Sequence, residues 1–253
     1  MIIIPSRMAS QRLPRKPLHL ISGVSLIERV ATRAMASGIE TVVATDDVSI
    51  AEHVAEFGGR AIMTSPELPS GTDRVAAALD ELERTSGTRY DFAINLQGDE
   101  PLMTPEVISH VARAMEDESV QVATPVSKIE SVAELRDPNV VKVVRSANGD
   151  ALYFSRSAIP HVRGDSAEPN PLWLALCTFY KHIGLYAYRP EALRAFVKLG
   201  ESMLERAERL EQLRLREAGI SIRTVEVAFD SIAVDTIEDV ARVEQALAQR
   251  GEA

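Results

Sequence analysis

The chain has 253 residues, of which 45% are hydrophobic, so it can bury a large core without disulfides or structural metals. Its formal net charge of −9 argues against binding to nucleic acids or anionic membranes, because both kinds of partner require a basic surface. The single cysteine, Cys177, excludes an intrachain disulfide and a thiolate-only metal cluster. Since no secretory signal or membrane-length apolar stretch is found, we expect a soluble cytoplasmic protein.

The first predicted element is a buried strand at residues 2–4, a β-branched apolar run that ends at Pro5. Ligands of α/β proteins usually bind at the carboxyl ends of such strands, and clustered cations beside backbone amides suit a polyphosphate. The alternative is an exposed, solvated loop, and the charges alone leave both interpretations open. The cations of this loop are Arg7, Arg12, Arg15 and Lys16.

The next part of the chain alternates strands and helices. Ser25 and Asp47 are suited to cap helices that end before Gly38 and near Phe57. This alternation predicts a parallel sheet covered by helices on both faces. The glycine motifs of dinucleotide folds and phosphate-loop ATPases are absent, so a bound nucleotide would need a different loop. The remaining elements are strands at residues 41–44, 60–63 and 92–96 and helices at residues 71–83 and 105–115.

From about residue 120 the pattern changes to strands, and Asn148-Gly149-Asp150 between two of them indicates a hairpin. Residues 160–176 read as a long irregular loop, and Thr236 is suited to begin a terminal helix. Because no linker is evident, we expect a single domain over residues 1–253 with a β insertion at about residues 120–160. The expected strands are 120–126, 140–145, 152–155, 182–188 and 220–227, and the expected helices are 190–199 and 204–217.

Three motifs lie at predicted element ends. Asp99, in Gln97-Gly98-Asp99-Glu100-Pro101, follows an apolar strand, where it could bind a metal that bridges phosphates or simply form an acidic turn. Ser70 and Asp73 resemble a capping box, although a helix start beside glycine also suits an anion or a base edge. Thr236 and Asp239 form another capping pair, which leaves Asp235 available for Mg²⁺.

Together these motifs resemble those of the 3-deoxy-manno-octulosonate (Kdo) cytidylyltransferases. Residues 2–18 are similar to the family's Ile-Ile-Pro-Ala-Arg-x-x-Ser-x-Arg-Leu-Pro-Gly-Lys-Pro-Leu, with Ser6 in place of alanine and Arg15 in place of glycine. Residues 97–101 match the family motif at every position, and residues 234–239 differ only by Ile237 for proline. Glycine permits a positive φ, so Arg15 bears directly on the conformation of the loop.

Three later motifs extend the resemblance to an acceptor sugar. They are residues 153–156, 181–186 and 210–214, which match Tyr-Phe-Ser-Arg, Lys/Arg-His-x-Gly-x-Tyr and Leu-Glu-Gln-Leu-Arg. Without the resemblance, such polar positions are typical of solvent-facing surfaces. The resemblance implies that an acidic octulosonic sugar is bound by Gln97, Arg156, His182, Tyr186, Glu211 and Gln212.

The family resemblance implies a mixed α/β, Rossmann-like nucleotidyltransferase fold of the glycosyltransferase-A type. It also implies a homodimer, formed through the β extension near residues 130–160, that makes CMP-Kdo and pyrophosphate from CTP and Kdo for lipopolysaccharide synthesis. Arg7, Lys16 and Asp99 would be catalytic, and Asp99 and Asp235 would bind Mg²⁺. The implied nucleotide-binding residues are Pro5, Ser6, Arg7, Arg12, Lys16, Ser70, Gly71, Arg74, Gln97 and Asp99.

Two alternatives remain at this point. The acceptor could be the 8-amino analogue of Kdo, which a close family branch uses and with which residues 229–232 are weakly associated. A nucleotide-sensing module without turnover is disfavoured, because Lys16 and both metal-type carboxylates are present. Cys177 and the histidines offer no convincing catalytic triad.

Overall fold

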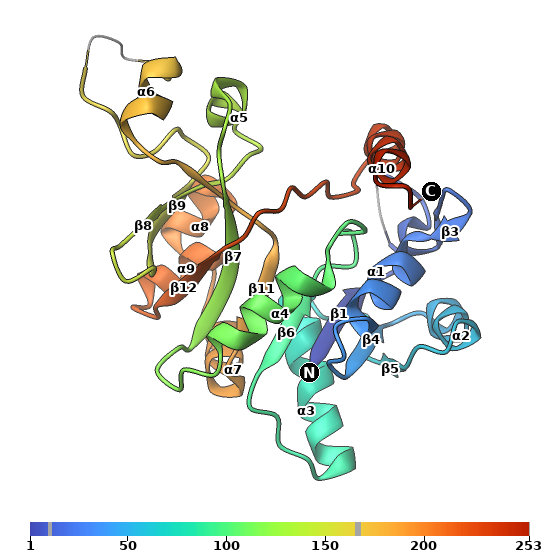
Figure 1. Ribbon diagram of the computed structural model, residues 1–253. Helices are drawn as coiled ribbons and strands as arrows, with labels where there is room; N and C mark the ends of the chain where they lie inside the picture. Colours follow the sequence, from blue (N-terminus) through green and yellow to red (C-terminus); the bar gives the residue numbers. More distant parts are fainter. Residues whose placement is uncertain (10–11, 165–167, 253) are drawn as a thin grey trace.

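The computed structural model describes residues 1–9, 12–164 and 168–252, and in these residues ten strands form one mixed sheet flanked by helices (Figure 1). The strands are β1 (Ile2–Ser6), β4 (Thr41–Thr45), β5 (Ala61–Met63), β6 (Ala93–Leu96), β7 (Val122–Lys128), β8 (Lys142–Arg145), β9 (Ala151–Ser155), β10 (Tyr180–His182), β11 (Leu185–Tyr188) and β12 (Ile222–Glu226). Their order is β5-β4-β1-β6-β11-β7-β10-β8-β9, and β12 pairs with β7. The predicted fold class is confirmed.

The helices cover both faces of this sheet. Ser25, Asp47, Ser70 and Thr236 each accept a hydrogen bond from a backbone N–H of the first turn, so the predicted caps are confirmed. The helices are α1 (Leu26–Met35), α2 (Val48–Glu56), α3 (Gly71–Ser86), α4 (Pro105–Ala114), α5 (Val132–Arg136), α6 (Pro171–Leu176), α7 (Pro190–Lys198), α8 (Met203–Glu208), α9 (Gln212–Glu217) and α10 (Ile237–Arg250). Short elements follow the first strand: η1 (Lys16–Leu18), β2 (Leu20–Ile21) and β3 (Val24–Ser25).

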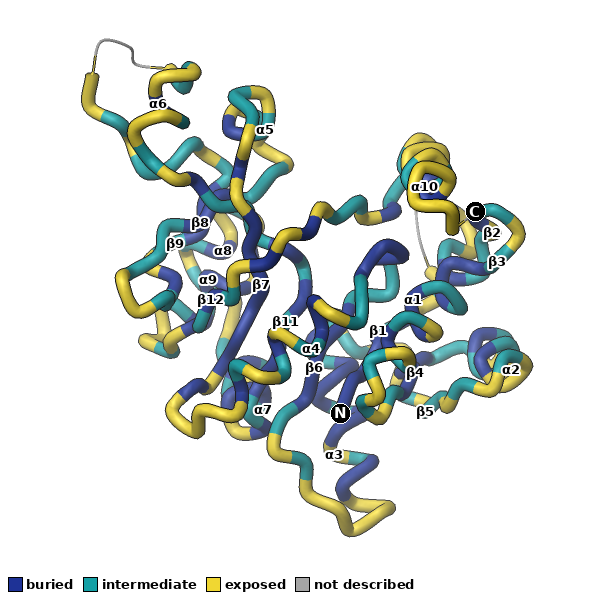
Figure 2. Tube along the Cα trace, in the orientation of Figure 1, coloured by how far each residue is buried: buried dark blue, intermediate teal, exposed yellow. Residues whose placement is uncertain are grey.

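The first half of the sheet is parallel, with β1 between β4 and β6. Successive residues of a strand point to opposite faces, and Ile2 and Ile4 pack with α1 and α10 while Ile3 packs with α3 and α7. Figure 2 shows these central strands buried. The prediction of a parallel sheet covered on both faces is confirmed for this half, and it brings the ends of β1 and β6 together.

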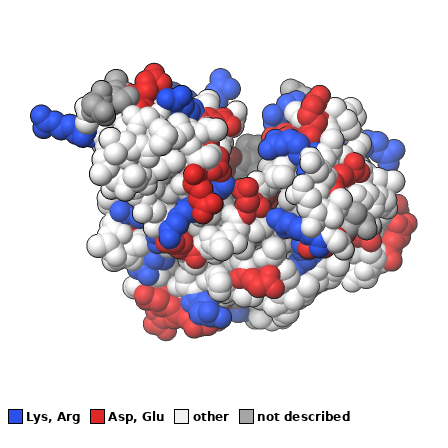
Figure 3. Space-filling model, turned by 45° about the horizontal axis from the view of Figure 1, so that its top comes forward, with Lys and Arg blue, Asp and Glu red and all other residues white. Residues whose placement is uncertain are grey.

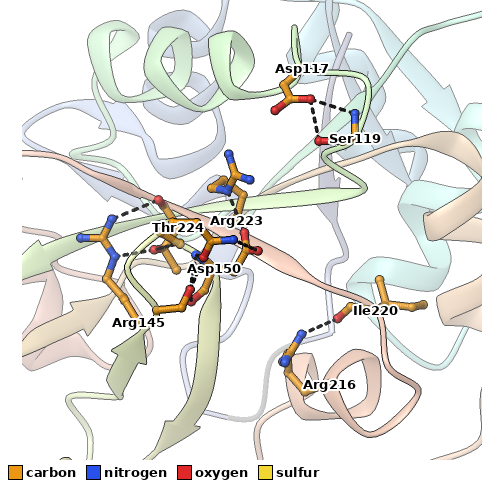
Figure 4. Close-up of polar contacts among 11 residues, drawn as sticks. Asp117, Ser119, Arg145, Asp150, Arg216, Ile220, Arg223 and Thr224 are labelled. Carbon is orange, nitrogen blue, oxygen red and sulfur yellow. Dashed lines mark hydrogen bonds and ion pairs between the residues drawn. The ribbon is translucent and has the colours of Figure 1, made fainter.

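The second half is antiparallel except for β12, which runs parallel to β7. The predicted β8–β9 hairpin turns at Gly149, whose φ of 89° is in the left-handed region that favours glycine. Arg145 Nε donates to Thr224 Oγ1 at 2.6 Å and Arg223 Nε contacts Asp150 Oδ1 at 2.7 Å (Figure 4). These contacts fasten the hairpin to β12.

Four predicted elements differ from the structure. The first strand does not end at Pro5: β1 continues to Ser6, and Pro5 and Ser6 pair with Ala44 and Thr45 of β4, because the loss of one N–H donor at proline does not end the pairing of its neighbours. The expected loop at residues 160–176 contains α6, which is capped by Asn170; residues 165–167 of this range lie outside the described residues. The expected helix at residues 204–217 is two helices, because Arg209 adopts a left-handed conformation with φ 53°. The expected strand at residues 182–188 breaks before Leu185, where the chain changes from pairing with β8 to pairing with β6.

A connecting segment, residues 227–236, runs from β12 to α10 and lies beside the ends of β1 and β6 (Figure 1). Val234 N donates to Asp99 O at 2.9 Å, which fixes the segment against the loop after β6. Asp235 is thereby placed near that loop. No helix in the described part of the chain is long and apolar enough to cross a bilayer.

Candidate active site

A pocket opens at the carboxyl ends of β1 and β6, and we call it the N-terminal pocket. Figure 3 shows the surface of the molecule hollowed between its two halves, with acidic and basic side chains around the hollow. Every residue predicted to bind the nucleotide, except Ser70, lines this pocket. The lining residues are Pro5, Ser6, Arg7, Ala9, Arg12, Lys16, Pro17, Gly71, Arg74, Gln97, Gly98, Asp99 and Asp235.

Lys16 bridges the two carboxylates that the sequence proposes as metal ligands. Its Nζ donates to Asp99 Oδ2 at 2.8 Å and to Asp235 Oδ1 at 2.9 Å. Burial by itself would lower the pKa of Lys16, but the two carboxylates outweigh it and raise that pKa, so the ammonium stays charged. Arg12 adds a contact of 3.1 Å to Asp235 from an exposed position. Asp99 and Asp235 therefore converge on one cationic group.

Arg15 keeps the backbone conformation that glycine would adopt. Its φ of 53° and ψ of 35° are left-handed, and it precedes the short helix η1 that carries Lys16. The Arg15 residue is exposed and does not line the N-terminal pocket. The substitution thus leaves Lys16 as the cation of η1 that faces the pocket. Ser10 and Gln11, which belong to the same motif, lie outside the described residues.

At the start of α3, one residue caps the helix and the next residue lines the pocket. The Ser70 hydroxyl accepts from Asp73 N at 3.2 Å and donates to Asp73 Oδ2 at 2.6 Å, so capping accounts for this side chain. Gly71 lines the pocket instead, and an added Cβ there would lie 3.4 Å from Pro5 Cγ and from Gln97 Oε1. A larger residue at position 71 would narrow the pocket.

Arg74 is the buried cation of the N-terminal pocket, with 2% of the residue exposed. Its guanidinium forms an ion pair of 2.8 Å with Asp46 and a hydrogen bond to Thr64. Because Asp46 balances its charge, Arg74 is held in a fixed position at the pocket wall.

A second pocket, which we call the central pocket, adjoins the first and shares Gly71 and Gln97 with it. Two polar atoms of its wall, Tyr186 Oη and Gln212 Nε2, are buried and have no hydrogen-bond partner of good geometry among the described residues. Thr124 lies close to Tyr186 but donates its own proton to Leu185 O at 2.7 Å. The central pocket is lined by Gly71, Thr72, Asn95, Gln97, Gly184, Tyr186, Tyr188, Arg209, Leu210, Glu211 and Gln212.

Arg156 and His182, which were predicted to bind the acceptor, line an adjoining groove rather than the central pocket. The Arg156 guanidinium donates to the carbonyl oxygens of Glu208 at 2.7 Å and Pro138 at 2.9 Å, so part of its donor set is used by the backbone. The groove and the central pocket share Gly184 and Arg209, so the predicted acceptor residues are neighbours.

His182 is neutral in this arrangement. Although the residue keeps partial exposure, its ring is closely surrounded, and this burial lowers its pKa to about 4. Its Nε2 lies 3.1 Å from Thr124 Oγ1, whose proton is committed to a carbonyl, so Nε2 carries the ring hydrogen. His182 therefore offers hydrogen bonds to a ligand, not positive charge.

Comparison with known proteins identifies the family. The cytidylyltransferase family model matches residues 1–222. The 3-deoxy-manno-octulosonate cytidylyltransferase of Cytophaga hutchinsonii is 45% identical over 95% of this chain and 94% of its own length. The protein of the same name from Syntrophotalea carbinolica is 46% identical over 96% of each chain. The chain belongs to the 3-deoxy-manno-octulosonate cytidylyltransferase family.

Solved structures agree with this membership. A CMP:2-keto-3-deoxy-manno-octonic acid synthetase complexed with CTP has a TM-score of 0.87 and 43% identity, covering 98% of each chain. A cytidylyltransferase from Leptospira borgpetersenii, with a TM-score of 0.58 and 14% identity, shares the fold. The resemblance drawn from the sequence motifs is confirmed.

The structure adds to the site buried polar residues that were not among the predicted site residues. Thr72 and Asn95 line the central pocket, and 5% and 1% of these residues are exposed. Asn95 had a visible signal, since it is a polar residue inside an apolar strand. Glu100 is buried next to Asp99 and accepts from Ser231 of the connecting segment; burial raises its pKa to about 8.

Outside these pockets, one cluster of serine, histidine and glutamate side chains is connected in the way that a catalytic triad is. Ser25 Oγ lies 2.8 Å from His53 Nε2, and His53 Nδ1 lies 2.9 Å from Glu56 Oε2. However, Ser25 is 2% exposed and its hydroxyl caps α1. The cluster is structural, because a nucleophile must reach its substrate.

Proposed function

We propose that the protein transfers the cytidylyl group of CTP to Kdo and releases pyrophosphate. The observation that carries this proposal is a pair of adjoining pockets that share Gly71 and Gln97. One is lined by cations and two carboxylates, which suits a metal-bound triphosphate, and the other by hydrogen-bonding groups, which suits a polyhydroxylated sugar. The names of the family relatives favour Kdo over its 8-amino analogue.

We infer that Asp99 and Asp235 hold Mg²⁺. Both carboxylates lie within 2.9 Å of one ammonium group, so they can also approach one small cation. No group of three or more acidic, histidine or cysteine side chains suited to a metal occurs in the described residues, and Mg²⁺ commonly takes its remaining ligands from phosphates and water. When bound, the ion would offset the charge of the triphosphate.

The residues of the N-terminal pocket would promote an in-line displacement. The anomeric hydroxyl of Kdo loses its proton to solvent as its oxygen forms a bond to the α-phosphorus, while the bond to the pyrophosphate oxygen breaks. Lys16, Arg7 and Arg12 would stabilise the negative charge that collects on the departing pyrophosphate. Because the two pockets meet at Gln97, the reactants can be held next to each other, and positioning then supplies much of the rate.

The central pocket and the adjoining groove would bind the acceptor by directional hydrogen bonds. The unpaired groups of Tyr186 and Gln212 need partners, and sugar hydroxyls can provide them. In neutral His182, Nε2 donates to Thr124, so Nδ1 remains as an uncharged hydrogen-bond acceptor. Arg156 is the cation suited to the sugar carboxylate. Its guanidinium group has N–H donors in addition to those that contact backbone carbonyls, and these could bind the carboxylate.

The test is a pyrophosphate-release assay with purified protein and Mg²⁺. We expect rapid release with CTP plus Kdo, weak release with UTP, since an unmatched base leaves buried polar groups unpaired, and none with ATP. Activity with the 8-amino analogue alone would overturn the choice of acceptor. Tight CTP binding with no pyrophosphate release in the presence of either sugar would indicate a nucleotide sensor and not an enzyme.

We also propose a cytoplasmic homodimer that serves lipopolysaccharide synthesis. The family resemblance motivates this proposal, and β9 supports it, because this strand ends the described sheet and presents Leu152 with 53% of the residue exposed. Sedimentation analysis should give twice the chain mass for the wild type, and Leu152→Glu should weaken the association. A monomer at micromolar concentration would contradict it.

A further inference from the structure

Four polar side chains form a continuous chain of hydrogen bonds behind the two pockets. Gln97 Nε2 donates to Asn95 Oδ1 at 2.7 Å, and Asn95 Nδ2 donates to Thr72 Oγ1 at 3.4 Å. Thr72 Oγ1 then donates to Glu211 Oε2 at 3.2 Å. The chain links the ends of β6 and α9 through the first turn of α3. It therefore connects Gln97, which lines both pockets, to the far wall of the central pocket.

The chemistry of these groups gives the chain a direction. Burial raises the pKa of Glu211, but while this carboxylate is ionised it only accepts hydrogen bonds, and the Thr72 hydroxyl donates to it. The oxygen of Thr72 is then left to accept from the Asn95 amide nitrogen, which turns the Asn95 carbonyl toward Gln97. Gln97 must consequently present its nitrogen to Asn95. The acceptor-only character of Glu211 thus determines which end of the Gln97 amide faces inward.

Burial makes this direction difficult to reverse. Asn95 and Thr72 are almost completely buried, so water cannot replace a lost hydrogen bond there. If the Gln97 amide turned over, its carbonyl oxygen would face the carbonyl oxygen of Asn95 unless Asn95 turned as well. If Asn95 also flipped, its carbonyl oxygen would face Thr72 Oγ1, which needs a donor there. A single flip would therefore leave buried groups unpaired.

The outward end of Gln97 lies at the junction of the two pockets. Gln97 Oε1 would be 3.4 Å from a Cβ built on Gly71, and Gly71 lines both pockets. We propose that Thr72 and Asn95 are positioning residues, which hold the Gln97 amide so that Oε1 accepts a hydrogen bond from a hydroxyl of the acceptor sugar. This inference rests on the proposed function and assigns the orientation of one of its groups.

Matched variants of Thr72 test the relay. Thr72→Val keeps the shape of the side chain and removes the hydroxyl, whereas Thr72→Ser keeps the hydroxyl. We expect Thr72→Val to lower kcat/KM for the sugar by about tenfold, the size of one misdirected hydrogen bond, with CTP binding within about twofold of the wild type. Thr72→Ser should retain most of the activity. An equal loss in both variants would overturn the relay, since packing would then explain the effect.

A double-mutant cycle with Gln97→Ala shows whether the effect passes through Gln97. If it does, adding Thr72→Val to Gln97→Ala should cause little further loss of kcat/KM. Losses that multiply would mean that Thr72 acts independently, and the proposal would fail. Wild-type activity in the same assay tests the proposed function separately.

A readout without turnover completes the test. The side-chain amide signals of Gln97 in ¹⁵N NMR spectra can be assigned by their absence in Gln97→Ala. We expect these signals to move in Thr72→Val and to stay in place in Thr72→Ser. Unchanged signals in both variants would overturn the relay whether or not the protein uses Kdo.

Discussion

The parallel and antiparallel halves of the molecule approach recognition in different ways. At the ends of β1 and β6, side chains of opposite charge form ion pairs: Lys16 lies between Asp99 and Asp235, and Arg74 is paired with Asp46. Across the central pocket, Tyr186 and Gln212 present polar groups that have no hydrogen-bond partner in the described part of the chain. The first arrangement suits a ligand that is itself highly charged, and the second suits one recognised by the direction of its hydroxyls.

The largest effect expected from this comparison comes from the carboxylates. Asp99→Asn or Asp235→Asn removes a hard anionic ligand while keeping the size of the side chain, so turnover should fall on the order of 10³-fold or more. Pyrophosphate release at limiting Mg²⁺ measures the loss, and circular dichroism checks the fold. Near-normal release by a folded variant would contradict the metal assignment.

Lys16 and Arg15 provide a matched pair of adjacent cations. Lys16→Ala should lower kcat/KM on the order of 10²-fold, because Lys16 lines the pocket that we propose binds the triphosphate. Arg15→Gly should cost much less, since Arg15 lies outside the pocket lining and glycine accepts the same left-handed backbone. Steady-state kinetics at saturating Kdo compares the two, and the reverse order would transfer the phosphate role to Arg15.

His182, in the antiparallel half, should make the stability of the folded protein depend on pH. Its pKa of about 4 in the folded protein lies below the ordinary value of 6.5, so the unfolded chain binds the extra proton first as the pH falls. Neutral His182 therefore contributes fully to the stability of the folded protein above pH 6.5, and this contribution is lost as the pH falls from about 6.5 to 4. Because the residue as a whole keeps partial exposure, we expect a loss of about 2 kcal/mol in the free energy of unfolding.

Urea unfolding at pH 7 and at pH 4.5 measures this loss. His182→Gln keeps a donor toward Thr124 but does not titrate, so its stability should fall less over the same interval. Parallel pH profiles for the two proteins would show that His182 is not the group responsible.

Tyr186 gives the smallest and most selective change. Tyr186→Phe removes a buried hydroxyl that lacks a partner in the described residues, so the folded protein should be as stable or slightly more stable. At the same time kcat/KM for the sugar should fall about tenfold, with CTP binding unchanged. Calorimetry and kinetics measure both. A matching loss of CTP binding would mean that the two halves do not divide recognition as described.

The elements of the parallel half could be predicted because their signals are local. Ser25 and Asp47 cap the helices where the sequence places them, and the apolar run at residues 2–4 lies within β1. The break at Arg209 had no such signal, since arginine rarely adopts a positive φ and no glycine marks the position. Helix α6 was hidden in a polar, proline-rich stretch whose order depends on packing around Trp173.

The same distinction holds for the site. The residues of the N-terminal pocket follow strand ends in short motifs, so the family pattern located them. Thr72 and Asn95 were not among the predicted site residues, and their contacts join positions that are distant in sequence: Asn95 contacts Thr72, and Thr72 contacts Glu211. Such contacts follow from tertiary packing, which a motif of five or six residues does not contain.

The connecting segment also has a consequence for how the protein is made. Lys16 and Asp235, which form one ion pair, are separated by 219 positions in the chain. Ribosomes release the amino-terminal end first, so η1 leaves the ribosome long before its second carboxylate partner is synthesised. Contacts between such distant positions also form late in folding, since a long loop must close. The Lys16–Asp235 contact of the N-terminal pocket can therefore form only after residue 235 has been synthesised, and a chain terminated before that residue would lack it.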